Sequence, residues 1–214
     1  MTLVNGYLQR SELKTAIGDT TVAHDDEHDR AIEAASRQID LWCGPPPGRQ
    51  FWQDTAASAR VFRARDRTLV CPGDFDATAG LIVETDDDAD GIFETLWDTS
   101  EWQAEPFNRW SGFPYTSITT TTRTREFPLD ARRPRIRVTT KWGWAGPPSP
   151  VKQACLSLAT LYFRSKDMAG VGIGIDWSTT TISADPVSLA MKLVQPLAIE
   201  GGLLFGIPQV PTHG

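Results

Sequence analysis

The sequence predicts an α+β protein: a small helical bundle with an antiparallel β insertion between its long helices, followed by an extended C-terminal tail. Two amphipathic helices are predicted far apart in the chain, at 25–43 and 150–166. The long stretch between them consists of short β-branched or aromatic runs separated by Gly, Pro and Asp clusters. The last residues are apolar, but glycines and prolines interrupt them. We therefore expect residues 1–48 and 149–196 to form a helical core, 49–148 a β-rich insertion, and 197–214 an extended arm.

The helix predicted at 150–166 organises the rest of the chain. It follows the turn in WGWAGPPSPVKQA, where Ser149 is a suitable N-cap and Pro150 suits the first helical position. Its apolar residues return every three or four positions: Val151, Ala154, Cys155, Leu158, Ala159, Leu161, Tyr162 and Phe163. Such a wide stripe has to be covered by other elements.

The helix predicted at 25–43 is the natural partner. Acidic residues crowd its first turn, where they favour the helix dipole, and Gly44 ends it. A shorter helix, capped by Ser11 and stopped by Gly18, precedes it. We expect the two long helices to pack on each other through five core positions: Ile32, Ile39, Trp42, Leu158 and Tyr162.

The insertion contains six predicted strands, at 59–63, 68–71, 81–85, 92–97, 116–119 and 135–140. The last alternates Arg and Thr with Ile and Val, which indicates a strand with one wet face. After the organising helix we expect a glycine-rich loop at 170–174 and a helix from Val187 to Val194 capped by Asp185.

Composition excludes several classes of protein. The 214 residues carry a net charge of −6, which argues against tight nucleic-acid binding. The three cysteines are an odd number at wide spacing, which argues against a disulfide framework, and we expect all three to be buried. No apolar run is long enough to span a membrane, and the N-terminus has no apolar signal-peptide segment.

Two patterns suggest metal binding. His24 to His28 matches H-x-x-E-H, a zinc-peptidase pattern, but His24 precedes the predicted helix and should not lie one turn below His28. Asp86, Asp88 and Asp90 match the first half of a calcium loop, but Trp97 occupies the closing position and Glu94 is displaced from it. We therefore expect no metal and no cofactor, and favour an acidic hairpin turn over a weak cation site at the aspartates.

An aromatic-rich stretch runs from Trp97 to Tyr115 and also contains Trp102, Phe107, Trp110 and Phe113. Such residues usually form the core of a small β domain, but they can also stack on sugars. Exposure of Trp97, Trp102 and Trp110 in a planar row would favour a sugar-binding module. No catalytic residue is predicted, since the chain has three histidines and no nucleophile motif.

The order of these segments resembles the head–tail connector (adaptor) proteins of tailed bacteriophages. The most specific parts are the strand-to-helix passage WGWAGPPSPVKQA and the helix AIEAASRQIDLWCG, and the similarity extends from Tyr7 to Leu197. The resemblance implies a structural virion protein, not an enzyme, in a homo-oligomeric ring of twelve-fold symmetry at the neck. Its partners would be the portal protein and a stopper or tail-completion protein. DNA would pass through the lumen without specific binding, with no membrane involved, and assembly would take place in the host cytoplasm.

The tail is expected to reach these partners. Leu203, Leu204, Phe205 and Ile207 are apolar, but the neighbouring glycines and prolines prevent a regular helix that would bury them. We expect this arm to bind the portal or a neighbouring subunit. The alternative function is a carbohydrate- or ligand-binding β module of a virion.

Overall fold

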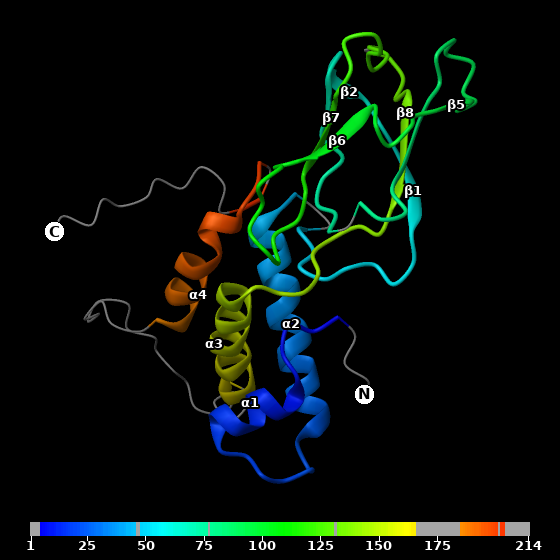
Figure 1. The fold of residues 1–214 in the computed structure, drawn as a ribbon. Coiled ribbons are helices and arrows are strands. Elements are labelled where there is room, and N and C mark those ends of the chain that lie inside the picture. Colours follow the sequence, from blue (N-terminus) through cyan, green and yellow to red (C-terminus); the bar gives the residue numbers. More distant parts are fainter. Residues whose placement is uncertain are drawn as a thin grey trace, which may run out of the picture. The chain divides into compact units, whose positions relative to one another are not determined.

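A computed structural model describes residues 5–45, 48–76, 78–130, 132–165, 185–200 and 202–203 (Figure 1). The chain forms two compact units, a helical unit of Met1–Phe51 with Pro147–Gly214 and a β unit of Trp52–Gly146. The fold class is α+β, as predicted. The sequence-based division into a helical core, a β-rich insertion and a C-terminal arm stays a prediction, because a division into separate domains requires that each part fold by itself.

The helical unit is built from an N-terminal and a C-terminal part of the chain. Its described helices are α1 (Arg10–Ile17), α2 (Asp25–Cys43), α3 (Ser149–Ser165) and α4 (Pro186–Val194), followed by the short 3-10 helix η2 (Gln195–Leu197). Helix α3 packs against both α2 and α4 (Figure 1). The sulfur of Cys155 in α3 lies 3.5 Å from the hydroxyl of Ser36 in α2. The predicted packing of the two long helices is therefore confirmed.

Two helix starts differ from the prediction. Helix α1 begins at Arg10 with Gln9 as its N-cap, and Ser11 lies inside it, because the Glu12 carboxylate accepts a hydrogen bond from the Gln9 N–H at 2.6 Å. Helix α3 already includes Ser149, because the carbonyl of Pro148 accepts from Val151 N at 2.9 Å.

Helix α4 begins where the sequence predicts. The Asp185 carboxylate accepts from the N–H groups of Val187 at 3.1 Å and Ser188 at 3.3 Å. The predicted glycine-rich loop at 170–174 lies outside the described residues.

The β unit contains two four-stranded sheets with antiparallel pairing, in the orders β1-β8-β4-β5 and β2-β3-β7-β6. The strands are β1 (Ser58–Phe62), β2 (Ala64–Asp66), β3 (Leu69–Val70), β4 (Ile82–Thr85), β5 (Thr95–Leu96), β6 (Trp102–Glu105), β7 (Ser117–Thr120) and β8 (Ile136–Thr140). Six correspond to predicted strands. The sequence missed β2, which is short and polar, and β6, whose aromatic residue was considered only as a core or stacking residue.

Strand β8 shows the expected alternation: Ile136 and Val138 are fully buried, while Arg137 and Thr139 between them are half-buried. The two sheets share one core, since its members come from strands of both. This core consists of Val70, Phe75, Leu81, Val83, Trp97, Trp102, Ala104, Ile118, Phe127, Ile136, Val138 and Trp142. The expectation for the cysteines is partly wrong: Cys43 and Cys155 are buried, but Cys71, just after β3, is exposed.

Candidate functional site

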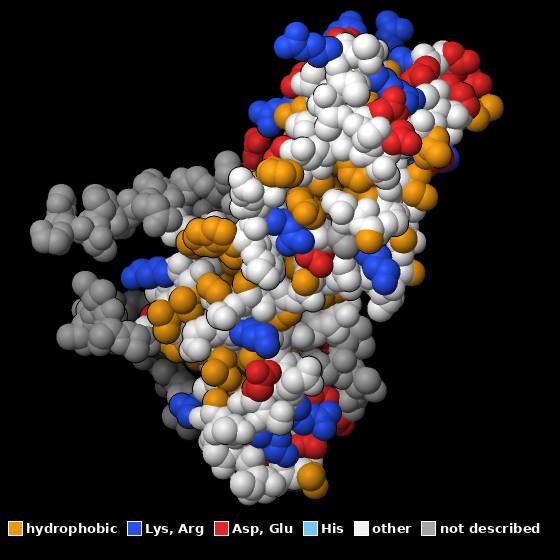
Figure 2. All heavy atoms as spheres, in the orientation of Figure 1, with side chains coloured by type: hydrophobic (Ala, Val, Ile, Leu, Met, Phe, Trp, Pro, Cys, Tyr) orange, Lys and Arg blue, Asp and Glu red, His pale blue; other side chains and the backbone are white. Residues whose placement is uncertain are grey.

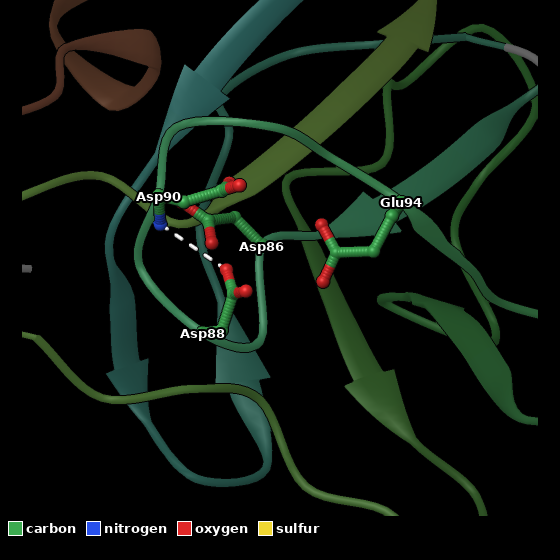
Figure 3. Close-up of side chains that lie close together, drawn as sticks. All are labelled: Asp86, Asp88, Asp90 and Glu94. Carbon is green, nitrogen blue, oxygen red and sulfur yellow. Dashed lines mark hydrogen bonds between the residues drawn. The ribbon is translucent and has the colours of Figure 1, made fainter.

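The acidic loop between β4 and β5 brings four carboxylates together. Asp86, Asp88, Asp90 and Glu94 each place one oxygen within 4.8 Å of the others (Figure 3). In the sequence Glu94 is displaced from the closing position, which Trp97 occupies, yet its carboxylate lies beside the aspartates. The loop folds back on itself and returns Glu94 to them, helped by Ala89 in the left-handed region at φ 67°.

Hydrogen bonds within the acidic loop account for this clustering. The buried carboxylate of Asp86 accepts from Ala89 N at 2.6 Å and Gly91 N at 3.0 Å. The Glu94 carboxylate accepts from Asp87 N at 3.1 Å. Because β4 and β5 pair in antiparallel fashion, the predicted acidic hairpin is confirmed. Carboxylate oxygens suit Ca²⁺, and at least one oxygen of each of these carboxylates also accepts a hydrogen bond from the loop backbone.

A second group joins Asp19, His24 and His28. The Oδ2 atom of Asp19 lies 3.2 Å from His24 Nδ1 and 3.3 Å from His28 Nε2. His24 is the N-cap of α2, and its carbonyl accepts from the His28 N–H at 3.0 Å. The expectation that His24 does not lie one turn before His28 is therefore wrong, because an N-cap residue already accepts the first helical hydrogen bond.

His28 is completely buried, and neither of its ring nitrogens makes a hydrogen bond to the described residues. Its ring packs on Phe163 of α3 at 4.4 Å between centroids. Burial lowers the pKa of the His28 imidazole, which favours its neutral form. A buried polar atom without a partner costs about 1–3 kcal/mol, so this side chain requires an explanation.

The five core positions predicted for the helices occupy two environments. Ile32, Ile39, Trp42 and Leu158 are buried, whereas Tyr162 is half-buried. Tyr162 borders an open pocket of about 330 Å³ between α2 and α3, lined by Glu27, Arg30, Ala31, Ala34, Tyr162 and Phe163. Among the described residues, the apolar stripe of α3 is therefore buried along its first turns and half-buried at Leu161, Tyr162 and Phe163.

Sequence reasoning missed a buried polar cluster at the start of the chain. The Tyr7 hydroxyl donates to the Asp40 carboxylate and accepts from Phe51 N at 3.0 Å. The Tyr7 N–H donates to Ser36 Oγ at 3.1 Å. Burial raises the pKa of Asp40 to about 6, although its bonds with Tyr7 and Arg37 act in the opposite direction. The segment before α1 is thus fixed to α2 by polar groups, which periodicity cannot reveal.

The aromatic stretch divides between core and surface. Trp97 and Trp102 are buried, whereas Phe107 is 67% and Trp110 79% exposed. The rings of Trp110 and Phe113 meet at 88°, so they do not form a planar row. Trp97 and Trp102 are therefore not available for stacking on sugars, and the exposed rings of Trp110 and Phe113 do not lie in one plane.

The exposed residues belong to an aromatic loop, residues 106–114, that Arg109 holds in place. The Arg109 guanidinium donates to the carbonyls of Asp76 at 2.9 Å and Phe113, and lies 4.3 Å from the centre of the Tyr115 ring. Asp and Glu side chains of the β unit gather beside β5 (Figure 2). The β unit therefore presents an exposed aromatic loop and an acidic surface.

The start of the tail is bonded to α2. Arg49 donates to the Leu197 carbonyl, and Ile199 N donates to the Cys43 carbonyl at 2.8 Å. Leu203 is 67% exposed. The other predicted tail residues, Leu204, Phe205 and Ile207, lie outside the described residues.

Comparison with known proteins gives no relative by sequence: no protein-family model and no curated protein matches. Within the part of the chain that the structure describes, no helix is long and apolar enough to cross a membrane. Similar solved structures include the neck of an empty gene transfer agent particle computed with C6 symmetry, with a TM-score of 0.53, 16% identity, and coverage of 90% of this chain and 92% of that chain. A chain of the virion of a native gene transfer agent particle gives a TM-score of 0.50 and 15% identity, over 92% of both chains. The chain therefore shares its fold, over nearly its whole length, with proteins of such particles.

Proposed function

We propose that the chain is a head-to-tail connector subunit, a structural and non-catalytic component of the neck of a tailed virion. The observation that carries this proposal is the likeness to a neck chain across 90% of this chain and 92% of that chain. A match that includes both the helical and the β unit supports a shared role better than a match of one unit, because single folds serve many functions.

The subunits form a ring beneath the portal, and the ring joins the capsid to the stopper or tail while DNA passes through its lumen. The neighbouring neck was computed with C6 symmetry. Twelve-fold symmetry contains the six-fold rotation, so a ring of twelve subunits is compatible with that neighbour. Such rings need head-to-tail contacts between two different surfaces of each subunit.

The aromatic loop is the surface best suited to such a contact. Phe107 and Trp110 are largely exposed, and Arg109 fixes the backbone that carries them. An ordered loop loses little conformational freedom on binding, and exposed aromatic rings gain from burial. In this proposal the loop packs on a neighbouring subunit, while residues 204–214 bind the portal.

Carbohydrate binding by the β unit is less well supported than the connector role. It requires several of Trp97, Trp102 and Trp110 at the surface, and the first two are buried.

The test mixes the purified chain with its cognate portal protein and images the mixture by electron microscopy. We expect class averages with a ring added below the portal. Substituting both Phe107 and Trp110 by Ser should abolish the added ring with a change in Tm of less than about 2 °C, because exposed side chains contribute little to folding. Truncation after Leu203 should keep the fold and weaken attachment to the portal.

The matched control is Leu129→Ser, a change at another exposed apolar residue of the β unit, 47% exposed. It should leave the ring intact. Absence of any complex between the wild-type chain and the portal would overturn the proposed function. Normal rings with the doubly substituted chain would overturn only the role of the aromatic loop.

A further inference from the structure

His28 is the feature of the helical unit that packing alone does not explain. It is completely buried, yet neither ring nitrogen makes a hydrogen bond to the described residues. Its Nε2 atom lies 3.3 Å from Asp19 Oδ2, but the two atoms do not form a hydrogen bond. An imidazole nitrogen in this situation has an unused lone pair or an unused N–H group.

The groups around His28 are those that bind transition metals. Asp19 and His24 come from the loop before α2, and their nearest atoms are 3.2 Å apart. Zinc ligands at 2.0–2.1 Å in tetrahedral geometry lie roughly 3.3–3.4 Å from one another. The separation from His24 to Asp19, which is a hydrogen bond in this structure, and the separation from Asp19 to His28 therefore both have the length that a shared ion requires.

The third separation requires a movement of His24. The two ring centroids are 6.3 Å apart, whereas two imidazoles on one tetrahedral zinc have centroids about 5 Å apart. Among the described residues, only the acidic loop has all its ligand atoms within 4.8 Å of one another. The His24 side chain is 46% exposed at the start of α2, so its ring can turn. The His28 ring, in contrast, is fixed by its packing against the Phe163 ring of α3.

We propose that Asp19, His24 and His28 bind one divalent transition-metal ion, of which zinc fits best, when the His24 ring turns toward the other two. Two imidazoles with one carboxylate favour zinc, cobalt or nickel over calcium. The other oxygen of Asp19 accepts from Thr21 N at 2.8 Å, which orients the carboxylate and leaves Oδ2 for the ion. The ion would fix the loop between α1 and α2 to the start of α2.

The positive charge of Lys14 opposes the binding of a cation at the proposed site. Its ammonium group bonds to the Asp25 carboxylate at 2.7 Å and to the Thr21 carbonyl, close to the proposed site. Asp25 also pairs with Arg10 at 2.8 Å, so its charge is shared between two cations. Lys14→Gln should therefore strengthen zinc binding.

The experiment uses the full chain without an affinity tag, stripped with EDTA. Zinc is added during calorimetric titration and thermal melting. We expect one ion per chain and a saturable rise in Tm. Asp19→Asn and His24→Ala should each weaken binding more than about tenfold, as expected for the loss of a ligand. His28→Leu should also lose zinc binding while keeping the helical fold, since Leu fills an apolar site without leaving polar atoms unpaired.

The matched control is Glu94→Gln in the acidic loop, which should keep zinc binding at the wild-type level. Zinc binding that Glu94→Gln removes and His24→Ala leaves unchanged would assign the ion to the acidic loop and overturn the proposal. A wild-type chain that shows neither heat of binding nor a change in Tm would overturn it as well. The proposal does not depend on the connector role, so the portal-binding experiment does not decide it.

Discussion

The two units use different means to define one structure. The core of the helical unit contains polar and ionisable groups, among them Tyr7, His28, Ser36 and Asp40. The shared core of the β unit is apolar and aromatic, and the indole N–H groups of Trp97 and Trp142 donate to Thr85 Oγ1 at 3.1 Å and to the Ser58 carbonyl at 2.9 Å. Hydrogen bonds between buried groups therefore add to apolar packing in the helical unit, at Tyr7, Ser36 and Asp40, whereas apolar and aromatic packing dominates the shared core of the β unit. This difference predicts distinct responses to substitution and pH.

The largest effect is expected from Leu158→Asp in α3. Leu158 is completely buried, and an aspartate there has no ion-pair partner in the apolar stripe. We expect a loss of at least about 3 kcal/mol in the free energy of unfolding, measured by urea denaturation followed by circular dichroism. Leu189→Asp in α4 is the matched control, because Leu189 is 46% exposed. Equal losses for both variants would contradict the assignment of Leu158 to the core.

A smaller effect is expected from Gly143→Ala in the β unit. Gly143 has φ 95°, and a Cβ atom there would lie 1.9 Å from the Trp52 carbonyl oxygen. Backbone strain and this clash together should cost about 2–4 kcal/mol. Gly18→Ala is the control: Gly18 has φ 75° but open space around it, so only the backbone cost of about 1 kcal/mol should appear. If the two variants melt at the same temperature, the close approach at Gly143 is wrong.

The sequence alone predicted much of the helical unit and less of the β unit, for a physical reason. The helix that begins at Asp25 was predicted from its acidic first turn, and the helix that begins at Pro186 from its N-cap Asp185. Both also have a regular apolar stripe, and all these signals are local in the sequence. The strand at Trp102–Glu105 depends on pairing with β7, which no local signal reveals.

The candidate metal site was harder to predict than either unit. The motif from His24 to His28 is visible in the sequence, but Asp19 joins it only because the loop before α2 folds back. In the acidic loop, the spacing in the sequence groups the aspartates, and the fold of the loop brings the Glu94 carboxylate to them. In both groups, spacing in the sequence identified some of the candidate metal ligands. The remaining ligand, Asp19 or Glu94, could be found only from the folded structure.

The last prediction concerns pH and isolates the polar cluster of the helical unit. Burial raises the pKa of Asp40 from 3.8 to about 6, so the folded state holds this proton more tightly than the unfolded state does. The resulting stabilisation is complete below pH 3.8 and is lost as the pH rises through about 6, by about 2–3 kcal/mol in total. Asp40→Asn cannot ionise, so the difference in unfolding free energy between this variant and the wild type should change by that amount between pH 4 and pH 6.5 and stay constant above.

Tyr7→Phe sharpens this test. The Tyr7 hydroxyl donates to the Asp40 carboxylate and thereby lowers the pKa that burial raises. Removing the hydroxyl should therefore move the upper end of the pH window above about 6, because the carboxylate loses a stabilising donor. Urea denaturation across this pH range measures both changes. A wild-type chain and an Asp40→Asn variant with parallel stability profiles would show that burial does not raise the pKa of Asp40 in the folded state, and would contradict this prediction.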